Sequence, residues 1–512
     1  MRNVVLTGSQ LTPFDVMAIA KGEATVRIAD AALERVRAAR RTVDGILDRG
    51  ETVYGINTGF GALVNTTIGS SDLERLQVNL LRSHATALGE PLSEFRTRAM
   101  MTVRLNSLVK GHSGVHEDPL HLLVDLLNHG ITPYVPHLGS LGASGDLAPL
   151  AHMALVLIGE GLVWSESKAV PSLNVLREAG LNPIHLRAKD GLSLINGTSL
   201  MAALLAEASV MLQRLVPMAD LVLCASLESR RCSVRPFDPR IHDVRPHPGQ
   251  RIVANRVTQW MQGSPNVADH ADCDRVQDPY SFRCAAQVHG VTVERLEALQ
   301  KTIAVELNAV TDNPLVFPDP SNPGPHEVIS QGNFHGEVLG QTADSTALAL
   351  FEHASISERR MDQILDPARS GGRPFLARTS GLESGLMIVH YVAGAALAEM
   401  HGGILPRSGF STVTSGGQED HVSMGATACF NLLRVIDRFA DVLSCEALIA
   451  CEAIEGLPVQ PSDAVRTLHQ LVRSVVPALL EDRSTTTDLE AIREALLSGS
   501  WLAVVDSLHP VA

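Results

Sequence analysis

Hydrophobic positions recur at helical spacing along most of this 512-residue chain. One apolar stripe steps by four, three and four residues, which predicts a helix over residues 426–453. The stripe consists of Leu432, Ile436, Phe439 and Leu443. Residues 199–228 are very apolar but interrupted by Pro217, and we expect burial on nearly all sides, in a bundle centre or at a subunit interface. A third helix is predicted over residues 291–307, before the Asp-Asn-Pro stop at 312–314.

Strand signals are few and short. Apolar alternation or β-branched runs occur only in fragments such as residues 24–28 and 315–317. Proline and glycine at residues 318–325 indicate a surface loop and not a domain linker. We therefore expect a mainly α fold. Its N-terminal part, residues 1–200, is expected to be mixed, and residues 201–512 are expected to form a central and C-terminal bundle of long helices.

Composition places the chain among soluble globular proteins. It is 45% hydrophobic, and its formal net charge of −14 offers no basic footprint for nucleic acid or an anionic membrane. The N-terminus has no apolar signal region, and the seven cysteines form no Cys-x-x-Cys pair. We expect a cytoplasmic protein that binds neither nucleic acid nor membrane.

Residues 139–149, GSLGASGDLAP, place three glycines around an Ala-Ser-Gly tripeptide, directly before a helix start. The simplest interpretation is a tight turn in which Asp146 caps the helix. The tripeptide also permits a particular reaction. If the Gly145 nitrogen attacks the Ala143 carbonyl and two water molecules leave, Ser144 becomes a dehydroalanine in a methylidene imidazolone ring. Gly145 is the least hindered nucleophile for this step and permits the strained turn.

A glycine-rich loop at residues 54–61, YGINTGFG, begins with Tyr54. Its spacing does not match a dinucleotide-binding or Walker loop, so a phosphate cradle is disfavoured. A mobile lid that closes and excludes water fits this pattern better.

Residues 277–284, QDPYSFRC, combine an amide, a phenol and a guanidinium within a short segment. On a helix, Tyr280 and Arg283 would be three residues apart and could face one cavity. The planar fork of Arg283 suits a substrate carboxylate, because it can donate two parallel charge-assisted hydrogen bonds. The alternative is a surface arginine near a core tyrosine.

Three histidines and an aspartate raise the question of a metal site: His112, His116, His121 and Asp118. Two glycines and Pro119 are expected to break the helix that would align these side chains, and no second ligand cluster appears. We therefore expect no metal here.

The sequence GASGDLAPLAH at residues 142–152 resembles the cofactor segment of the aromatic amino-acid ammonia-lyases and aminomutases, and of the histidine ammonia-lyases in particular. The resemblance extends from Tyr54 to about Met424. It implies a long-helix bundle of the ammonia-lyase and fumarase type, assembled as a homotetramer whose sites combine residues from three chains. It also implies that Ala143-Ser144-Gly145 forms the 4-methylidene-imidazol-5-one group (MIO), with no external cofactor and no metal.

The same resemblance implies roles for several side chains. Tyr54 would remove the substrate's β-proton, and Arg283 would hold its carboxylate. Asn196, which alone would simply mark an Asn-Gly turn, would hydrogen-bond the ring carbonyl or the substrate. Phe334 would pack beside the ring. The carboxylate-binding segment adds two further site residues, Gln277 and Tyr280.

Two residues bear on the choice of substrate. His84, followed by the small Ala85, and Glu419, in QEDHVSM, match the forms found in histidine ammonia-lyases. A carboxylate and an imidazole facing one pocket suit an imidazole substrate better than a bare phenyl ring. Residues 400–412 depart from the family, because histidine ammonia-lyases usually carry a segment like His-Pro-x-Ser-Val-Asp-Ser there.

The expected activity is therefore the elimination of ammonia from L-histidine to give trans-urocanate. The nearest alternative is an aminomutase, or a lyase for tyrosine or phenylalanine, and the departing loop leaves this alternative open. An alternative of another class is an inactive homologue with a structural or binding role. The intact tripeptide, Tyr54, Tyr280 and Arg283 argue against that alternative.

Overall fold

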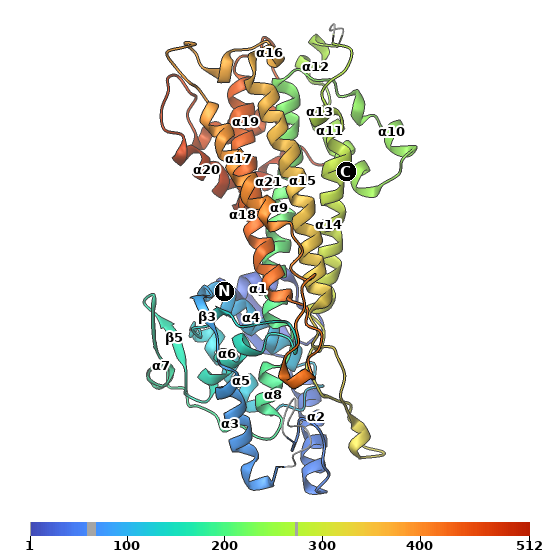
Figure 1. Cartoon of the computed structure of the whole chain (residues 1–512), viewed down its shortest axis with the longest axis vertical. Helices are drawn as coiled ribbons and strands as arrows, with labels where there is room; N and C mark the ends of the chain where they lie inside the picture. The colour runs from blue at the N-terminus through green and yellow to red at the C-terminus, as the bar shows by residue number, and fades with distance from the viewer. Residues whose placement is uncertain (1, 59–67, 272–274, 512) are drawn as a thin grey trace. The chain divides into compact units, whose positions relative to one another are not determined.

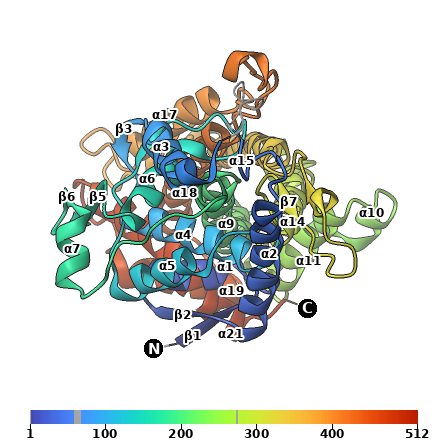
Figure 2. The same ribbon diagram turned by 90° about the horizontal axis from the view of Figure 1, so that it is seen from below.

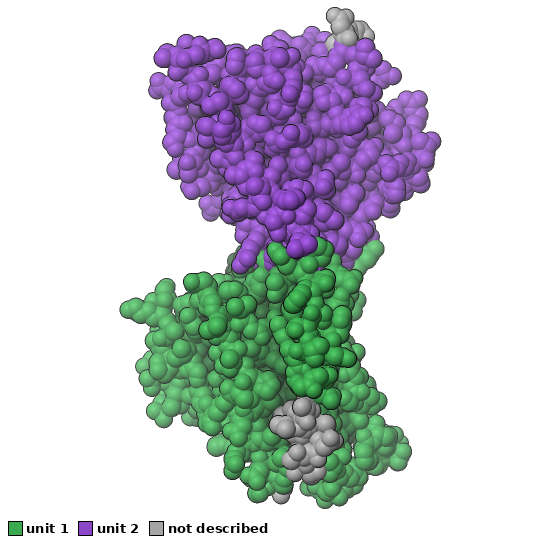
Figure 3. Space-filling model, in the orientation of Figure 1, with its two compact units in different colours: residues 1–207, 300–343, 406–430 green, residues 208–299, 344–405, 431–512 purple. Residues whose placement is uncertain are grey.

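A computed structural model describes residues 2–58, 68–271 and 275–511, and the fold is mainly α, as expected (Figure 1 and Figure 2). The chain divides into two compact units (Figure 3). Unit 1 comprises residues 1–207, 300–343 and 406–430, and unit 2 comprises residues 208–299, 344–405 and 431–512. Four long helices each contain a point where the chain changes unit: α9 (Ser199–Ser229), α14 (Ala285–Glu306), α15 (Glu337–Leu365) and α18 (Gly425–Ile454).

Unit 1 combines helices with short two-stranded sheets. Its own helices are α1 (Pro13–Ala20), α2 (Asp30–Asp48), α3 (Leu73–His84), α4 (Glu94–Leu108), α5 (Glu117–His129), α6 (Leu147–Leu157), α7 (Ser172–Glu178) and α8 (Asp190–Ile195). Its strands are β1 (Arg2–Leu6), β2 (Ala24–Ile28), β3 (Leu88–Pro91), β4 (Pro136–Leu138), β5 (Leu162–Ser165), β6 (Lys168–Pro171), β7 (Leu315–Val316) and β8 (Val328–Ile329). Strands β1 and β2 pair in parallel, and the other three pairs are antiparallel.

The two strands expected from the sequence are β2 and β7, whereas β1 escaped prediction. The hydrogen bonds of β1 come from β2, about twenty residues further along. Its own five residues therefore carry little of the sequence pattern that predicts a strand. Helices and short strands thus alternate in the N-terminal part of the chain.

Local sequence sets several helix ends in unit 1. Thr12 and Asp15 form a reciprocal capping box at the start of α1, with hydrogen bonds of 3.2 and 3.1 Å. His116 Nδ1 accepts from the Asp118 amide at 3.3 Å and so caps α5. Pro119 was expected to break this helix but lies in its first turn, where a proline's missing N–H costs nothing.

Unit 2 contains the larger parts of the four long helices, together with shorter helices of its own. Its own helices are α10 (Pro239–Asp243), α11 (Pro248–Trp260), α12 (Pro265–Asp269), α13 (Tyr280–Arg283), α16 (Pro367–Ser370), α17 (Met387–Gly403), α19 (Asp463–Val475), α20 (Thr486–Ser498) and α21 (Ser500–Leu508). The helix predicted over residues 426–453 is α18, and the apolar stripe that predicted it is fully buried.

Two other helix predictions need correction. Helix α9 continues through Pro217 without a break, because burial of its apolar side chains outweighs the single backbone hydrogen bond that proline removes. Helix α14 begins at Ala285, six residues earlier than predicted. Gly290, just before the predicted start, permits close packing, since a Cβ on it would lie 2.5 Å from the Gln250 amide nitrogen of α11.

By length and composition alone, helix α9 could cross a membrane. However, 78% of its most apolar 18-residue stretch is buried inside the folded protein. It therefore has the character of a core helix. Of the two locations expected for this segment, a bundle centre accounts for its composition without a subunit interface.

Candidate active site

The Ala143-Ser144-Gly145 segment lies in unit 1, just before α6. Its backbone pairs with the chain that follows α8: the Asp146 amide donates to Gly197 O at 2.7 Å, and the Gly197 amide donates to Ser144 O at 3.3 Å. Ala143 packs in a buried apolar cluster with Val422 and Met424. Two distant parts of the chain thus hold the tripeptide in place.

Glycine is required at position 145 for two reasons. Its φ is +78°, and a Cβ there would lie 2.6 Å from Gly197 Cα and closer still to the Gly197 carbonyl. The absence of a side chain therefore lets two backbone segments approach at the centre of the site.

We expect Gly145→Ala to lower stability far more than Gly180→Ala. Gly180 has a similar φ of +72°, but a Cβ added there would meet nothing within 4 Å. Only the cost of the left-handed backbone, about 1–2 kcal/mol, therefore applies at Gly180. At Gly145 the backbone clash adds to that cost, for a total of at least about 3 kcal/mol. Thermal unfolding midpoints measure the difference, and equal shifts would contradict it.

Asp146 has a different role from the one expected. It precedes α6, but its carboxylate does not cap that helix. Instead it accepts from the amides of Leu200 and Met201, at 2.8 and 3.1 Å, and from Ser140 Oγ at 2.9 Å. It therefore ties the tripeptide to the N-terminus of α9. Complete burial raises the pKa of Asp146 to about 6.

Asn196 follows α8 and is buried beside this segment. The helix start is fixed by a fully buried ion pair, Lys189 Nζ to Asp312 Oδ2 at 2.7 Å. The side-chain Oδ1 of Asn196 is buried and has no hydrogen-bond partner in the described part of the chain. A buried amide group of this kind is costly unless a ligand or modified group satisfies it.

Glu419 contacts the tripeptide directly. Ser144 Oγ donates to Glu419 Oε1 at 3.1 Å, and Thr414 Oγ1 donates to Glu419 Oε2 at 2.6 Å. The Glu419 side chain is half-buried in this chain. The segment is anchored by Ser423, whose hydroxyl donates to Gly142 O at 3.1 Å.

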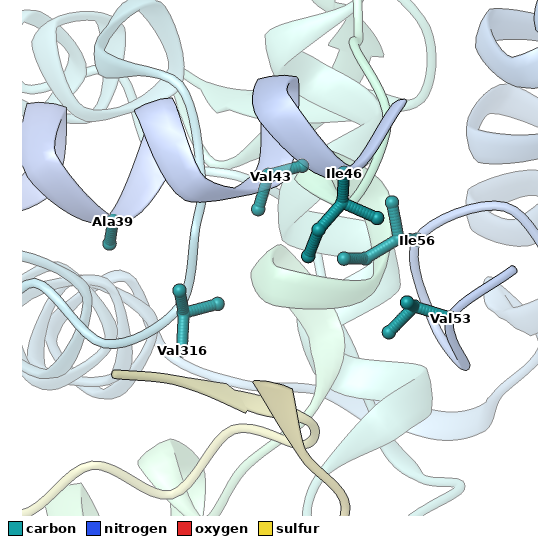
Figure 4. Close-up of a cluster of buried hydrophobic side chains, with 6 residues drawn as sticks. All are labelled: Ala39, Val43, Ile46, Val53, Ile56 and Val316. Carbon is teal, nitrogen blue, oxygen red and sulfur yellow. The ribbon is translucent and has the colours of Figure 1, made fainter. Parts of the chain in front are cut away.

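Tyr54 lies at the base of the glycine-rich loop. Val53, directly before it, and Ile56, two residues after it, pack into a buried cluster with α2 and β7 (Figure 4). Asn57 also ties the turn together, since its side chain accepts from the Val53 amide at 2.9 Å. The backbone around Tyr54 is thus fixed by packing and by a hydrogen bond. Residues 59–61 of the expected lid lie outside the described residues.

His84 is the last residue of α3. Its Nδ1 lies 2.9 Å from Leu80 O and 3.0 Å from Ser83 Oγ, and the tautomer with its proton on Nδ1 would donate to that carbonyl and present Nε2 as an acceptor. The chain just after it reaches the segment around the tripeptide: a Cβ on Gly139 would lie 3.1 Å from Ala87 Cβ and 3.0 Å from Ala148 Cβ. Helices α3, α6 and α8 also contact one another.

Phe334 is half-buried in the loop before α15. The neighbouring Gly336 packs tightly, because a Cβ there would lie 2.6 Å from Met201 Sδ and 2.8 Å from Ser423 Oγ. The loop that carries Phe334 is therefore held against Met201 and Ser423, which hydrogen-bond the residues on either side of the tripeptide.

The other three expected site residues, Gln277, Tyr280 and Arg283, lie in unit 2. Gln277 and Arg283 line a cavity of about 910 Å³ that also contains several other arginines. The Arg283 guanidinium lies 4.2 Å from the centre of the Tyr280 ring, and its Nε donates to Asp278 O at 3.1 Å. Tyr280 is 69% exposed and does not line the cavity, so the two side chains do not share a cavity wall as expected.

Arg283 is available for an anion. Two of its arginine neighbours in the cavity are neutralised: Arg240 pairs with Asp238 and Arg275 with Asp278. Among the described residues, no carboxylate pairs with Arg283. A substrate carboxylate could therefore take both ends of its guanidinium fork.

Two groups of possible metal ligands occur in the described ranges, and neither includes His112, His116 or His121. One comprises Asp220, His289 and His353 in unit 2, and the other comprises His335, Glu337 and His421 in unit 1. His112 instead contacts the Val316 carbonyl through Nδ1, at 3.0 Å.

Sequence reasoning missed Thr414 and Ser423, which hold Glu419 and Gly142. The QEDHVSM segment contains Ser423, so its spacing from Glu419 was visible. Thr414 pairs with Glu419 through an isolated β-bridge, and nothing in the sequence marks that contact.

Comparison with known proteins shows which family this chain resembles. A family model described as aromatic amino acid lyase matches residues 11–474. A histidine ammonia-lyase from Sorangium cellulosum (strain So ce56) is 44% identical over 507 residues, covering 98% of this chain and 99% of that one. The crystal structure of histidine ammonia-lyase from Trypanosoma cruzi is 40% identical with a TM-score of 0.91, covering 100% of this chain and 96% of that one.

Similarity within this group extends to another activity. The crystal structure of tyrosine aminomutase from Streptomyces globisporus also has a TM-score of 0.91, at 33% identity, and the match covers 99% of each chain. The fold expected from the resemblance is thus confirmed, and it is shared by enzymes with different names. The chain belongs to the aromatic amino acid lyase family.

Proposed function

We propose that this enzyme is a histidine ammonia-lyase, which eliminates ammonia from L-histidine and releases trans-urocanate. The observation that carries the proposal is the hydrogen bond from Ser144 Oγ to Glu419 Oε1. It joins the serine of the tripeptide to the carboxylate that matches the histidine ammonia-lyase form of the sequence. Similarity to histidine ammonia-lyases over nearly the whole chain supports the same assignment.

The residues around Ser144 fit a methylidene imidazolone made from Ala143, Ser144 and Gly145. Gly145 offers an unhindered nitrogen in a left-handed turn, and the Asn196 amide has an unsatisfied buried atom. Turning that amide by 180° would place N–H donors there, which a ring carbonyl needs. The ring would supply an electrophile that makes the substrate amine a good leaving group.

The chain's own side chains would handle the rest of the substrate. Tyr54 would take the β-proton, which requires its phenol to ionise below the usual pKa of about 10. Arg283 would bind the carboxylate, with Gln277 and Tyr280 in the same segment. Phe334 would pack beside the ring.

Recognition of the imidazole would rest on His84 and Glu419. With the His84 proton on Nδ1, its Nε2 and the Glu419 carboxylate would both be acceptors, so either can take the N–H of an imidazole ring. A phenyl ring has no hydrogen-bond donor. Binding it would remove water from Glu419 and supply no hydrogen bond in its place, at a cost on the order of 1–3 kcal/mol. Thr414 would offset part of that cost, because its hydrogen bond to Glu419 does not depend on the Ser144 hydroxyl that ring formation removes.

The decisive experiment incubates the pure protein with histidine, tyrosine and phenylalanine in parallel. Ultraviolet absorbance detects the acrylate product, and separate assays detect ammonia and β-amino acids. We expect a preference for histidine of at least roughly tenfold in kcat/KM, and release of ammonia equal to urocanate.

Variants of the recognition residues sharpen this test. Glu419→Gln should reduce the preference for histidine, because an amide is a weaker partner for the imidazole than a carboxylate. His84→Phe should depress histidine turnover while leaving thermal stability nearly unchanged, since His84 lies at a partly exposed helix end. Faster turnover of tyrosine, or a β-amino acid with little ammonia, would replace the proposal with an aminomutase or a tyrosine enzyme.

The proposed assembly is a homotetramer with sites shared between subunits. Tyr280 is mostly exposed within one chain, which does not suit a residue that must work in a water-excluded site. Helix α17 also exposes an apolar face that includes Ile388, Tyr391 and Val392. Neighbouring subunits would cover both features.

The proposed location is the cytoplasm. The six cysteines in the described ranges are free thiols and most are buried, which suits a reducing compartment.

A further inference from the structure

The short helix that carries Tyr280 and Arg283 contacts a buried polar network in unit 2. Arg360, in α15, is 0% exposed, and its Nη1 donates to the Ser281 carbonyl in the middle of α13 at 3.3 Å. Its Nε and Nη2 donate to Glu446 of α18, at 2.5 and 3.0 Å. A buried bidentate pair of this kind fixes a guanidinium in both position and orientation.

Glu446 is itself fully buried and held by hydroxyl groups. Ser226 Oγ donates to Glu446 Oε1 at 2.7 Å, and Ser357 Oγ donates to Oε2. The carboxylate therefore receives hydrogen bonds from α9 and α15 as well as from Arg360. With all these bonds made, the buried charge pair is compensated and rigid.

A histidine completes the network from the other side. Arg360 Nη1 also contacts His289 Nε2 at 3.3 Å, and His289 Nδ1 contacts Asp220 Oδ1 at 2.8 Å. Burial, reinforced by the charge of Arg360, lowers the pKa of His289 well below its ordinary value. A neutral His289 can then donate from Nδ1 to Asp220 and accept at Nε2 from Arg360.

Asp220, His289 and His353 lie close enough together to hold a metal ion, but the neighbouring charges oppose one. Arg256 donates to Asp220 Oδ2 at 2.8 Å, and Arg360 contacts the other end of His289. Both nitrogens of His289 are thus engaged, and a cation would face two guanidinium groups. The group is better explained as a support for Arg360.

Helix α13 depends on such support because its own sequence gives it little. It has only four residues, and no side chain caps its N-terminus at Pro279. Phe282 is fully buried and anchors one face, while Arg283 and the exposed Tyr280 stack on each other. The bond from Arg360 to Ser281 therefore supplies a polar anchor between the two functional side chains.

We propose that Arg360 is a positioning residue: by holding the Ser281 carbonyl, it sets the place of Arg283 and so the affinity for the substrate carboxylate. The inference rests on the proposed function only in that Arg283 binds the carboxylate of an amino acid. It does not depend on whether that amino acid is histidine.

The test compares Arg360→Lys with Arg256→Lys. Lysine keeps the charge at position 360 but cannot reach Glu446, Ser281 and His289 at once. Arg256→Lys weakens a contact to Asp220, which also binds His289, and keeps the Arg360 side chain that donates to Ser281 O. Calorimetric binding is measured for two probes, imidazolepropionate, which has a carboxylate, and histamine, which has none.

We expect Arg360→Lys to weaken imidazolepropionate binding by at least about tenfold and histamine binding by less than about twofold. Arg256→Lys should change neither by more than about twofold. Hydrogen exchange should accelerate in residues 280–284 of the Arg360 variant alone. Equal weakening of both probes, or unchanged exchange at α13, would overturn the proposal and leave Arg360 a general core residue.

Two further measurements keep the test decisive. If Arg360→Lys does not fold, Glu446→Gln is used instead, because it removes the charge that orients Arg360 and keeps the shape of the side chain at position 446. It should likewise weaken imidazolepropionate binding more than histamine binding. In an Arg283→Lys background, Arg360→Lys should cost less than about threefold in KM, because the two residues act through one interaction. Full additivity would contradict the proposal. Kinetics use whichever amino acid the wild-type enzyme deaminates, so a wild type inactive on histidine counts against the proposed function alone.

Discussion

Replacement of Ser144 by alanine is expected to abolish turnover while leaving the fold intact. Alanine lacks the hydroxyl that must leave as water, so no exocyclic methylene can form at this position. The structural cost is small, because relative to the unmodified chain the change removes one hydrogen bond, to a half-buried Glu419 that keeps Thr414 as a partner. We expect kcat to fall by at least about 10³-fold with little change in thermal midpoint.

Intact mass spectrometry provides the second measurement. The wild-type chain should be lighter than its sequence by two water molecules, and Ser144→Ala should not show that deficit. Ser140→Ala is the matched control, since it removes a nearby hydroxyl that bonds Asp146 but leaves the tripeptide intact. That control should keep the deficit and lose some stability. An active wild type with the unmodified mass would show that the ring is not the catalytic group.

The helices and the tripeptide were predictable because their signals are local. The apolar stripe of α18 repeats over several turns, and the Ala-Ser-Gly chemistry needs three adjacent residues. Asp146 shows where local signals fail: its position before α6 suggested a cap for that helix, yet its carboxylate bonds amides 54 and 55 residues further along. Only the packed fold brings α9 to it.

The candidate site shows the same division. Tyr54, His84, Asn196 and Glu419 were identified through motif resemblance, whereas the partners that hold them were not. Thr414 and Arg360 lie in no motif, and Ser423 lies in QEDHVSM without any sign of its contact with Gly142, which is far away in sequence. Likewise, no sequence pattern shows that residues 300–343 and 406–430 return to unit 1.

Residues 400–412, whose sequence differs from the one usual in histidine ammonia-lyases, come just before the segment that carries Glu419. Near their end, Ser411 Oγ accepts from the Val422 amide at 2.9 Å, and just beyond them Thr414 pairs with Glu419. The unusual sequence therefore still leads into a segment that presents Glu419 to Ser144. The loop's departure alone does not remove the residue on which recognition of the imidazole is proposed to depend.

Mixing two inactive variants is expected to restore activity. Tyr54 belongs to unit 1 and Arg283 to unit 2, and the proposed tetramer takes them into one site from different chains. Tyr54→Phe lacks the proton acceptor, and Arg283→Ala lacks the carboxylate partner. If subunits exchange at random in an equal mixture, roughly one quarter of the sites receive both intact residues. We therefore expect recovery of about a quarter of the wild-type kcat from two preparations that are each nearly inactive.

The control mixes each single variant with the Tyr54→Phe, Arg283→Ala double variant. Because no hybrid of that kind can combine both intact residues in one site, no activity should return. Light scattering before and after exchange reports the assembly, and the recovered activity should appear at the rate of subunit exchange. An active monomer at working concentration, or a mixture that stays inactive after proven exchange, would place Tyr54 and Arg283 of one chain in the same site.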